Sequence, residues 1–76
     1  MLSGAQCRMA RGVMCWSVQQ LAERANVGLS TIKRLEALDS VPVSAQVGTL
    51  QAIAKAFTDT GKVRFEGLDG VYIVGV

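Results

Sequence analysis

Residues 16–36, WSVQQLAERANVGLSTIKRLE, contain two short amphipathic segments separated by only a few residues. Ser17 and Gln20 have the spacing of a capping box, so the first segment is expected to be a helix that begins at Val18. Asn26 tolerates the left-handed conformation that ends many helices, and Val27 then lies in a tight turn. The inner face of this helix consists of apolar residues at helical spacing: Val18, Leu21, Ala22 and Ala25.

The second segment is predicted to be a helix from about Gly28 to Leu38. Apolar residues recur in it at every third position: Leu29, Ile32, Leu35 and Leu38. Two helices joined by so short a turn cross at a steep angle, which is the helix-turn-helix arrangement. This arrangement needs a small residue at the crossing, here Ala22, and a polar front on the second helix. The sequence therefore predicts a helix-turn-helix at about 18–36 that exposes Ser30, Lys33 and Arg34.

A helix is also predicted before this motif. Ser3 and Gln6 form a second capping-box pattern, and the helix is expected to end near Cys15. Its apolar stripe is Cys7, Ala10 and Met14. Both cysteines are expected to be buried, because free cysteine behaves as a small hydrophobic residue. Eight residues apart on a helix, they are about 12 Å from each other, too far for a disulfide.

Two further elements follow the motif. Asp39, Ser40 and Pro42 predict a loop that runs to about Ser44. A helix is then expected over about 45–60, with a stop at Gly61. Its buried stripe is Leu50, Ile53, Ala54 and Phe57. In residues 63–76, alternating and β-branched residues flank the turn sequence GLDG, which predicts a β-hairpin.

The composition limits what the chain can do. Its 76 residues form one domain, half of them hydrophobic, with a formal net charge of +2. Two cysteines without any histidine cannot complete a zinc site, and no catalytic pattern or phosphate-binding glycine loop is present. We therefore expect no metal, no cofactor and no enzymatic activity. We also predict no signal peptide and no membrane span, and the cytoplasm as the compartment.

The run from Trp16 to Glu36 resembles the Xre family of helix-turn-helix proteins, typified by phage repressors and Cro. The elements that carry the resemblance are Leu21-Ala22, Val27, the run from Thr31 to Glu36, and Thr49-Leu50. The resemblance covers about residues 10–57 and implies a mainly α, four- or five-helix repressor-like DNA-binding domain. Residues 1–62 would form this domain, and residues 63–76 a C-terminal β-hairpin. The implied function is sequence-specific regulation of transcription, with repression as the expected outcome.

The resemblance also implies which residues face DNA. Base-reading residues would be Leu29, Ser30, Lys33 and Arg34. Arg34 suits the O6 and N7 of guanine, and Leu29 can contact a thymine methyl group. Residues expected at the DNA backbone are Ser17, Gln19, Gly28, Ser40 and Ser44. Arg11 and Glu36 resemble the ion pair that ties the first helix of the family to the third.

This chain departs from the family pattern at four positions. Val18 stands where the family usually has Gln. Because this Gln commonly contacts a phosphate, its replacement removes one expected contact with DNA. Asn26 replaces the turn glycine, and Gly28 replaces a Ser or Thr cap, both of which are tolerable changes. Cys15 replaces the glycine before Trp16 and Ser17, where it is expected to strain the turn.

A domain of this size makes few phosphate contacts, so a homodimer that reads two half-sites is expected. The last predicted strand is apolar on both faces, with Val71 and Ile73 on one and Tyr72, Val74 and Val76 on the other. One face can cover the helices, and the open strand edge favours pairing with a second chain. Residues 63–76 are therefore the expected dimerisation element.

Two other functions use the same helical domain. A protein-interaction adaptor would tend to lack adjacent basic residues on the exposed third helix, so Lys33 and Arg34 favour DNA. An antitoxin would bind both DNA and a toxin partner. Double-stranded DNA is the expected ligand of both a transcriptional regulator and an antitoxin. No membrane is expected as a partner.

Overall fold

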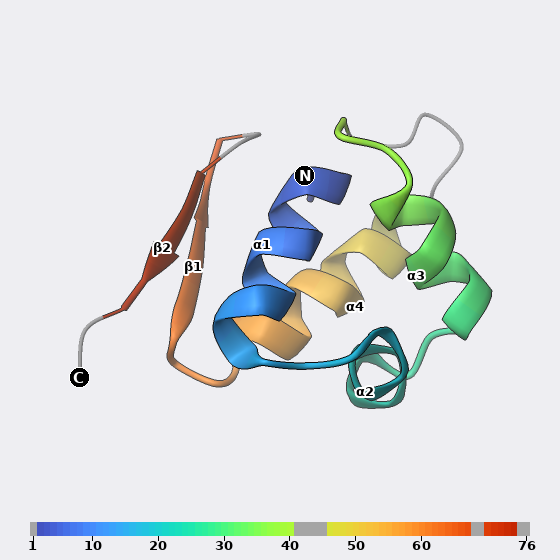
Figure 1. Cartoon of the computed structure of the whole chain (residues 1–76), viewed down its shortest axis with the longest axis horizontal. Helices are drawn as coiled ribbons and strands as arrows, with labels where there is room; N and C mark the ends of the chain where they lie inside the picture. Colours follow the sequence, from blue (N-terminus) through green and yellow to red (C-terminus); the bar gives the residue numbers. More distant parts are fainter. Residues whose placement is uncertain (1, 41–45, 68–69, 75–76) are drawn as a thin grey trace.

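The computed structural model describes residues 2–40, 46–67 and 70–74. Four α-helices and a β-hairpin follow one another within these residues (Figure 1). The helices are α1 (Gly4–Met14), α2 (Val18–Ala25), α3 (Leu29–Glu36) and α4 (Val47–Thr58). The strands are β1 (Val63–Glu66) and β2 (Gly70–Ile73). This architecture confirms the mainly α fold with a C-terminal hairpin.

Both predicted capping boxes are formed. The hydroxyl of Ser3 accepts a hydrogen bond from the backbone N–H of Gln6, and the Gln6 side chain accepts one from the backbone N–H of Ser3. Ser17 and Gln20 make the same reciprocal pair at the start of α2. Each box satisfies backbone donors that a helix leaves free in its first turn.

The ends of α1 and α2 are left-handed turns. Asn26 adopts φ 57° as predicted, and Cys15 adopts φ 57° one residue after α1. A non-glycine residue in this conformation carries backbone strain, which agrees with the expected strain at Cys15. The prediction that Cys15 is buried was wrong, because the left-handed turn ends the helix and leaves the residue exposed. Cys7 lies in the core as predicted.

The later helices are shorter than predicted. α3 ends at Glu36 rather than at Leu38, so Leu38 leaves the helical stripe and its side chain is 43% exposed. α4 runs from Val47 to Thr58 rather than over 45–60. After it, the Thr60 hydroxyl bonds Phe57 O and the chain turns at Gly61, which adopts φ 74°.

All four helices and strand β1 contribute residues to the core. Phe57 of α4 is fully buried, stacks on Trp16 with 5.2 Å between ring centroids, and meets Phe65 of β1 edge-on. Removing a large buried side chain of this kind costs about 3–5 kcal/mol. The most deeply buried aliphatic residues around it are Leu21, Ile32, Leu50 and Ile53. Ile32 and Leu35 hold the inner face of α3 to this core, as predicted.

The hairpin packs at one end of the helical domain, against α1 and α4 (Figure 1). Its register pairs Val63 with Ile73 and Phe65 with Val71. Val63 is buried and Phe65 and Val71 are half-buried, so this face covers the helices. Ile73 lies on the same face but is 70% exposed, because β2 is the outer strand. The expectation that one whole face of the last strand is covered therefore holds for Val71 and not for Ile73.

Candidate nucleic-acid interface

The segment 18–36 has the predicted helix-turn-helix form. α2 and α3 are joined by Asn26, Val27 and Gly28 alone. The N–H of Val27 bonds the carbonyl of Ala22 at 3.0 Å, which closes the turn onto the end of α2. Gly28 caps α3 with its backbone carbonyl, which accepts from the N–H groups of Thr31 and Ile32. The turn is therefore fixed by main-chain hydrogen bonds, and the direction of α3 is fixed with it.

The outward face of α3 carries the predicted base-reading residues. Leu29, Ser30, Lys33 and Arg34 are all exposed, whereas Ile32 and Leu35 on the opposite face are buried. Leu29 is an apolar side chain that is 40% exposed at the first position of the helix. This face offers hydrogen-bond donors, positive charge and one aliphatic group, the three kinds of contact that the major groove accepts.

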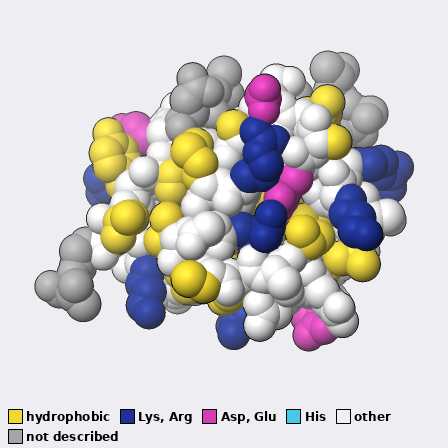
Figure 2. Space-filling model, viewed as in Figure 1, with side chains coloured by type: hydrophobic (Ala, Val, Ile, Leu, Met, Phe, Trp, Pro, Cys, Tyr) yellow, Lys and Arg dark blue, Asp and Glu magenta, His cyan; other side chains and the backbone are white. Residues whose placement is uncertain are grey.

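Lys33 and Arg34 differ from most other basic side chains of the protein. Three basic residues pair with carboxylates, namely Arg8, Arg11 and Lys55. Arg24 lies over the Trp16 ring and Arg64 over the Tyr72 ring. In the described part of the chain, Lys33, Arg34 and Lys62 have no such partner, and only Lys33 and Arg34 are adjacent. Figure 2 shows Lys and Arg side chains at the end of the molecule that carries α3, and others spread over the rest of the same face.

The predicted backbone-contacting residues lie around α2 and α3. Ser17, Gln19, Gly28 and Ser40 are exposed, and Ser44 lies outside the described residues. The Ser17 oxygen caps α2, so its hydroxyl hydrogen is the group left for a phosphate. Gln19 bonds Glu23 on the surface of α2 at 3.3 Å. The carbonyl of Ser40 accepts the N–H of Gly4, which places this residue beside the start of α1.

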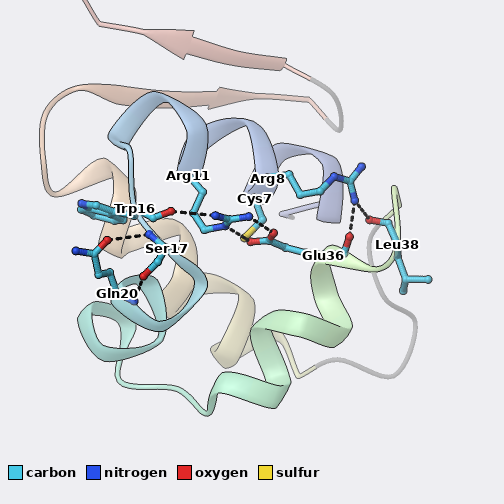
Figure 3. Close-up of polar contacts among 8 residues, drawn as sticks. All are labelled: Cys7, Arg8, Arg11, Trp16, Ser17, Gln20, Glu36 and Leu38. Carbon is cyan, nitrogen blue, oxygen red and sulfur yellow. Dashed lines mark hydrogen bonds and ion pairs between the residues drawn. The ribbon is translucent and has the colours of Figure 1, made fainter.

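The predicted ion pair between Arg11 and Glu36 is present (Figure 3). Arg11 donates through Nε and Nη2 to the two carboxylate oxygens, each at 2.8 Å. Its Nη1 donates to the carbonyl of Trp16 at 2.9 Å. The hydrogen bonding to Glu36 raises the pKa of Arg11 and outweighs the partial burial that would lower it. Arg11 thus ties the last residue of α3 to the turn that precedes α2.

Three contacts around this site were not predicted. The Cys7 thiol donates to Glu36, and Arg8 donates to main-chain carbonyls at the end of α3. Gln6 donates to the carbonyls of Gly67 and Gly70, both at 3.0 Å, and so fastens the hairpin to α1. The spacing of Gly4, Arg8 and Arg11 along one stripe of α1 was the available signal for the contact with α3.

Comparison with protein families, with curated proteins and with solved structures gives no match to this chain. Among the residues that the structure describes, no group of three or more histidine, cysteine or acidic side chains could hold a metal ion. Within the same residues, every helix is too short or too polar to cross a lipid bilayer.

Proposed function

We propose that this protein is a sequence-specific DNA-binding transcriptional regulator of the Xre type, acting in the cytoplasm as a repressor. The observation that carries the proposal is the outward face of α3. There, two adjacent basic residues, Lys33 and Arg34, are exposed and lack partners within the described residues, on the second helix of a helix-turn-helix. Unpaired positive charge on this face suits the negatively charged phosphates of DNA.

The chemistry of this face gives each side chain a role. Arg34 donates two parallel hydrogen bonds to the O6 and N7 of a guanine, the commonest specific contact in the major groove. Lys33 contacts a neighbouring base or phosphate, and Ser30 bonds either a donor or an acceptor. Leu29 packs on a thymine methyl group. Ser17, Gln19, Gly28 and Ser40 contact the phosphates on either side and fix the register.

The test is a selection of random duplex DNA by the purified protein, with Arg34→Ala carried in parallel. An enriched site that loses its preference at one position in the variant supports the proposal. The variant is expected to lose about 1–3 kcal/mol of binding free energy at the selected site. Affinity is expected to fall steeply with salt, because phosphate contacts release counterions.

Absence of any enrichment, or enrichment that Arg34→Ala leaves unchanged, would favour the adaptor function instead. Capture of a toxin encoded beside this gene, together with DNA binding, would favour the antitoxin function. Lys55→Ala is the matched control in the selection, since Lys55 is an exposed basic residue whose charge is already paired with Asp59.

We further propose that the protein acts as a homodimer joined through residues 63–76. Three apolar side chains are exposed at the end of this segment: Tyr72, Ile73 and Val74. Val74 N–H bonds Lys62 O, so the alternation of an antiparallel ladder points the amides of Val71 and Ile73 to the open edge of β2. A second β2 strand satisfies these amides and covers Ile73.

A further inference from the structure

The N-terminal half of α1 lies directly on the C-terminal end of α3. A Cβ atom built on Gly4 would fall 1.8 Å from the carbonyl oxygen of Leu38 and 2.3 Å from that of Leu35. Only glycine permits this approach. The N–H of Gly4 also donates to the carbonyl of Ser40 at 3.1 Å. The two chain segments are thus in backbone contact where α3 ends.

One turn further along α1, the side chain of Arg8 bonds main-chain carbonyls at the same end of α3 (Figure 3). Arg8 Nη1 donates to the carbonyl of Glu36 at 2.5 Å and to that of Leu38 at 2.9 Å. Its Nη2 pairs with the Asp39 carboxylate. The last carbonyls of a helix have no partner within the helix and carry partial negative charge, so a guanidinium is well suited to them.

We infer that Arg8 is a positioning residue for DNA recognition: it fixes the angle at which α3 presents Lys33 and Arg34. This inference rests on the proposed function. Arg11 hydrogen-bonds to the side chain of Glu36, and Arg8 hydrogen-bonds to the carbonyls of Glu36 and Leu38. Two residues of α1 therefore bind the same end of α3. Arg34 lies two residues before Glu36, about 3 Å along the helix axis.

The consequence for recognition follows from this short distance. A bidentate contact between Arg34 and guanine tolerates displacements of only about 0.5 Å. A helix end released from Arg8 can shift by more than this and still remain folded, because Ile32 and Leu35 stay buried. Contacts to phosphates are less demanding, since a charge attracts a phosphate over a longer distance. Loss of Arg8 therefore weakens specific binding more than nonspecific binding.

The experiment compares Arg8→Met, Arg8→Lys and Asp39→Asn with the natural protein. Binding is measured by fluorescence anisotropy on the selected site and on a scrambled duplex of equal length, each over a range of salt concentrations. Arg8→Met is expected to lose about tenfold in affinity for the selected site and to change little on the scrambled duplex. Arg8→Lys keeps the charge but not the fork of donors, so an intermediate loss of specificity is expected. Asp39→Asn keeps the carbonyl contacts and should match the natural protein.

Two results would overturn the inference. Equal losses on both duplexes, with the salt slope reduced by about one, would make Arg8 a phosphate contact. Unchanged affinities in a variant with a lowered melting temperature would make it a stabilising residue only. If the natural protein prefers no duplex, the proposed function fails. Amide hydrogen exchange over 33–38 in the DNA-free protein still tests whether Arg8 holds the end of α3, with faster exchange expected in Arg8→Met.

Discussion

The thiol of Cys7 donates a hydrogen bond to the Glu36 carboxylate, with 3.3 Å between Sγ and Oε2. The same carboxylate accepts two hydrogen bonds from Arg11, so Glu36 is held from two positions on α1. Burial raises the pKa of the Cys7 thiol far above its usual range, and the nearby negative charge of Glu36 raises it further. Cys7 therefore stays protonated in the folded protein in neutral and mildly alkaline solution.

This raised pKa predicts a loss of stability in mild alkali. A free thiol in the unfolded chain titrates near pH 9.0, whereas the folded protein keeps the proton. The stabilisation is complete below the unfolded pKa and is lost as the pH rises above it. The free energy of unfolding should fall by about 1.4 kcal/mol per pH unit above pH ~9 from this group alone.

Urea unfolding of the natural protein and of Cys7→Ser between pH 7 and 10.5 measures this slope. Serine keeps a donor for Glu36 and does not titrate in this range, so the variant should show a slope that is flatter by that amount. Cys15→Ser is the control at an exposed cysteine and should keep the natural slope. Equal slopes in all three proteins would mean that Cys7 is ionised in the folded state.

The pair between Arg11 and Glu36 predicts a strong asymmetry between single and double substitutions. The two side chains are 25% and 10% exposed, so most of the Glu36 carboxylate is removed from water. Arg11→Met leaves this charge with the Cys7 thiol alone and should cost close to 3 kcal/mol, the lower end of the range of about 3–5 for a buried pair. The double variant Arg11→Met with Glu36→Leu should recover most of the loss. A double variant as unstable as the sum of the two singles would rule out this explanation.

The parts of the fold that sequence predicted depend on contacts between near neighbours. The capping pairs of Ser3 with Gln6 and of Ser17 with Gln20 span three residues, and Asn26 ends α2 by its own backbone conformation. The Arg11 and Glu36 pair is distant in sequence and was expected only from the family resemblance. Local patterning therefore accounts for α1, α2 and the start of α3.

The features that sequence missed depend on main-chain atoms brought together by the fold. Arg8 binds carbonyls 28 and 30 residues away, and Gln6 binds carbonyls 61 and 64 residues away. Every residue has a carbonyl, so no residue type at the far end marks such a contact. The chain beyond Glu36 shows the same kind of contact, since Arg8 bonds the carbonyl of Leu38 and Gly4 bonds that of Ser40.

The backbone conformations of two glycines predict opposite effects of one substitution. Gly12 lies within α1, and a Cβ there would have no described atom within 4 Å. Gly12→Ala should stabilise the protein by about 0.5–1 kcal/mol by restricting the unfolded chain. Gly61 has φ 74°, so Gly61→Ala should destabilise it by about 1–2 kcal/mol. Thermal unfolding of both variants checks the sign, and destabilisation by Gly12→Ala would show that its site is not an open helical position.

The left-handed turn at Cys15 predicts a third glycine effect. Cys15→Gly should gain about 1 kcal/mol, because glycine adopts φ 57° without the clash that a Cβ atom creates. The gain should exceed that of Asn26→Gly, since asparagine tolerates the same conformation better than cysteine. Denaturant titrations of the two variants give the comparison, and an equal gain from both would mean that Cys15 carries no extra strain.

The proposed dimer predicts both an oligomeric state and the spacing of the DNA site. β2 and α3 lie at opposite ends of the longest axis of the molecule, which extends 35 Å (Figure 1). Two copies joined at β2 therefore hold their α3 helices farther apart than one turn of DNA, about 34–36 Å. The next spacing that presents both half-sites on the same side of the duplex is two turns, about 20–21 base pairs.

Sedimentation of the natural protein, of Ile73→Lys and of a chain lacking residues 71–76 tests the interface. The natural protein should be a dimer, and both altered chains should be monomers, because a charge at position 73 cannot be buried against a second strand. Lys62→Glu, a charge change one residue before β1, is the control that should leave the dimer intact. Half-sites selected one turn apart, or a dimer that survives both changes, would place the interface outside residues 63–76. Monomers that still select a single half-site would instead separate DNA reading by α3 from dimerisation by β2.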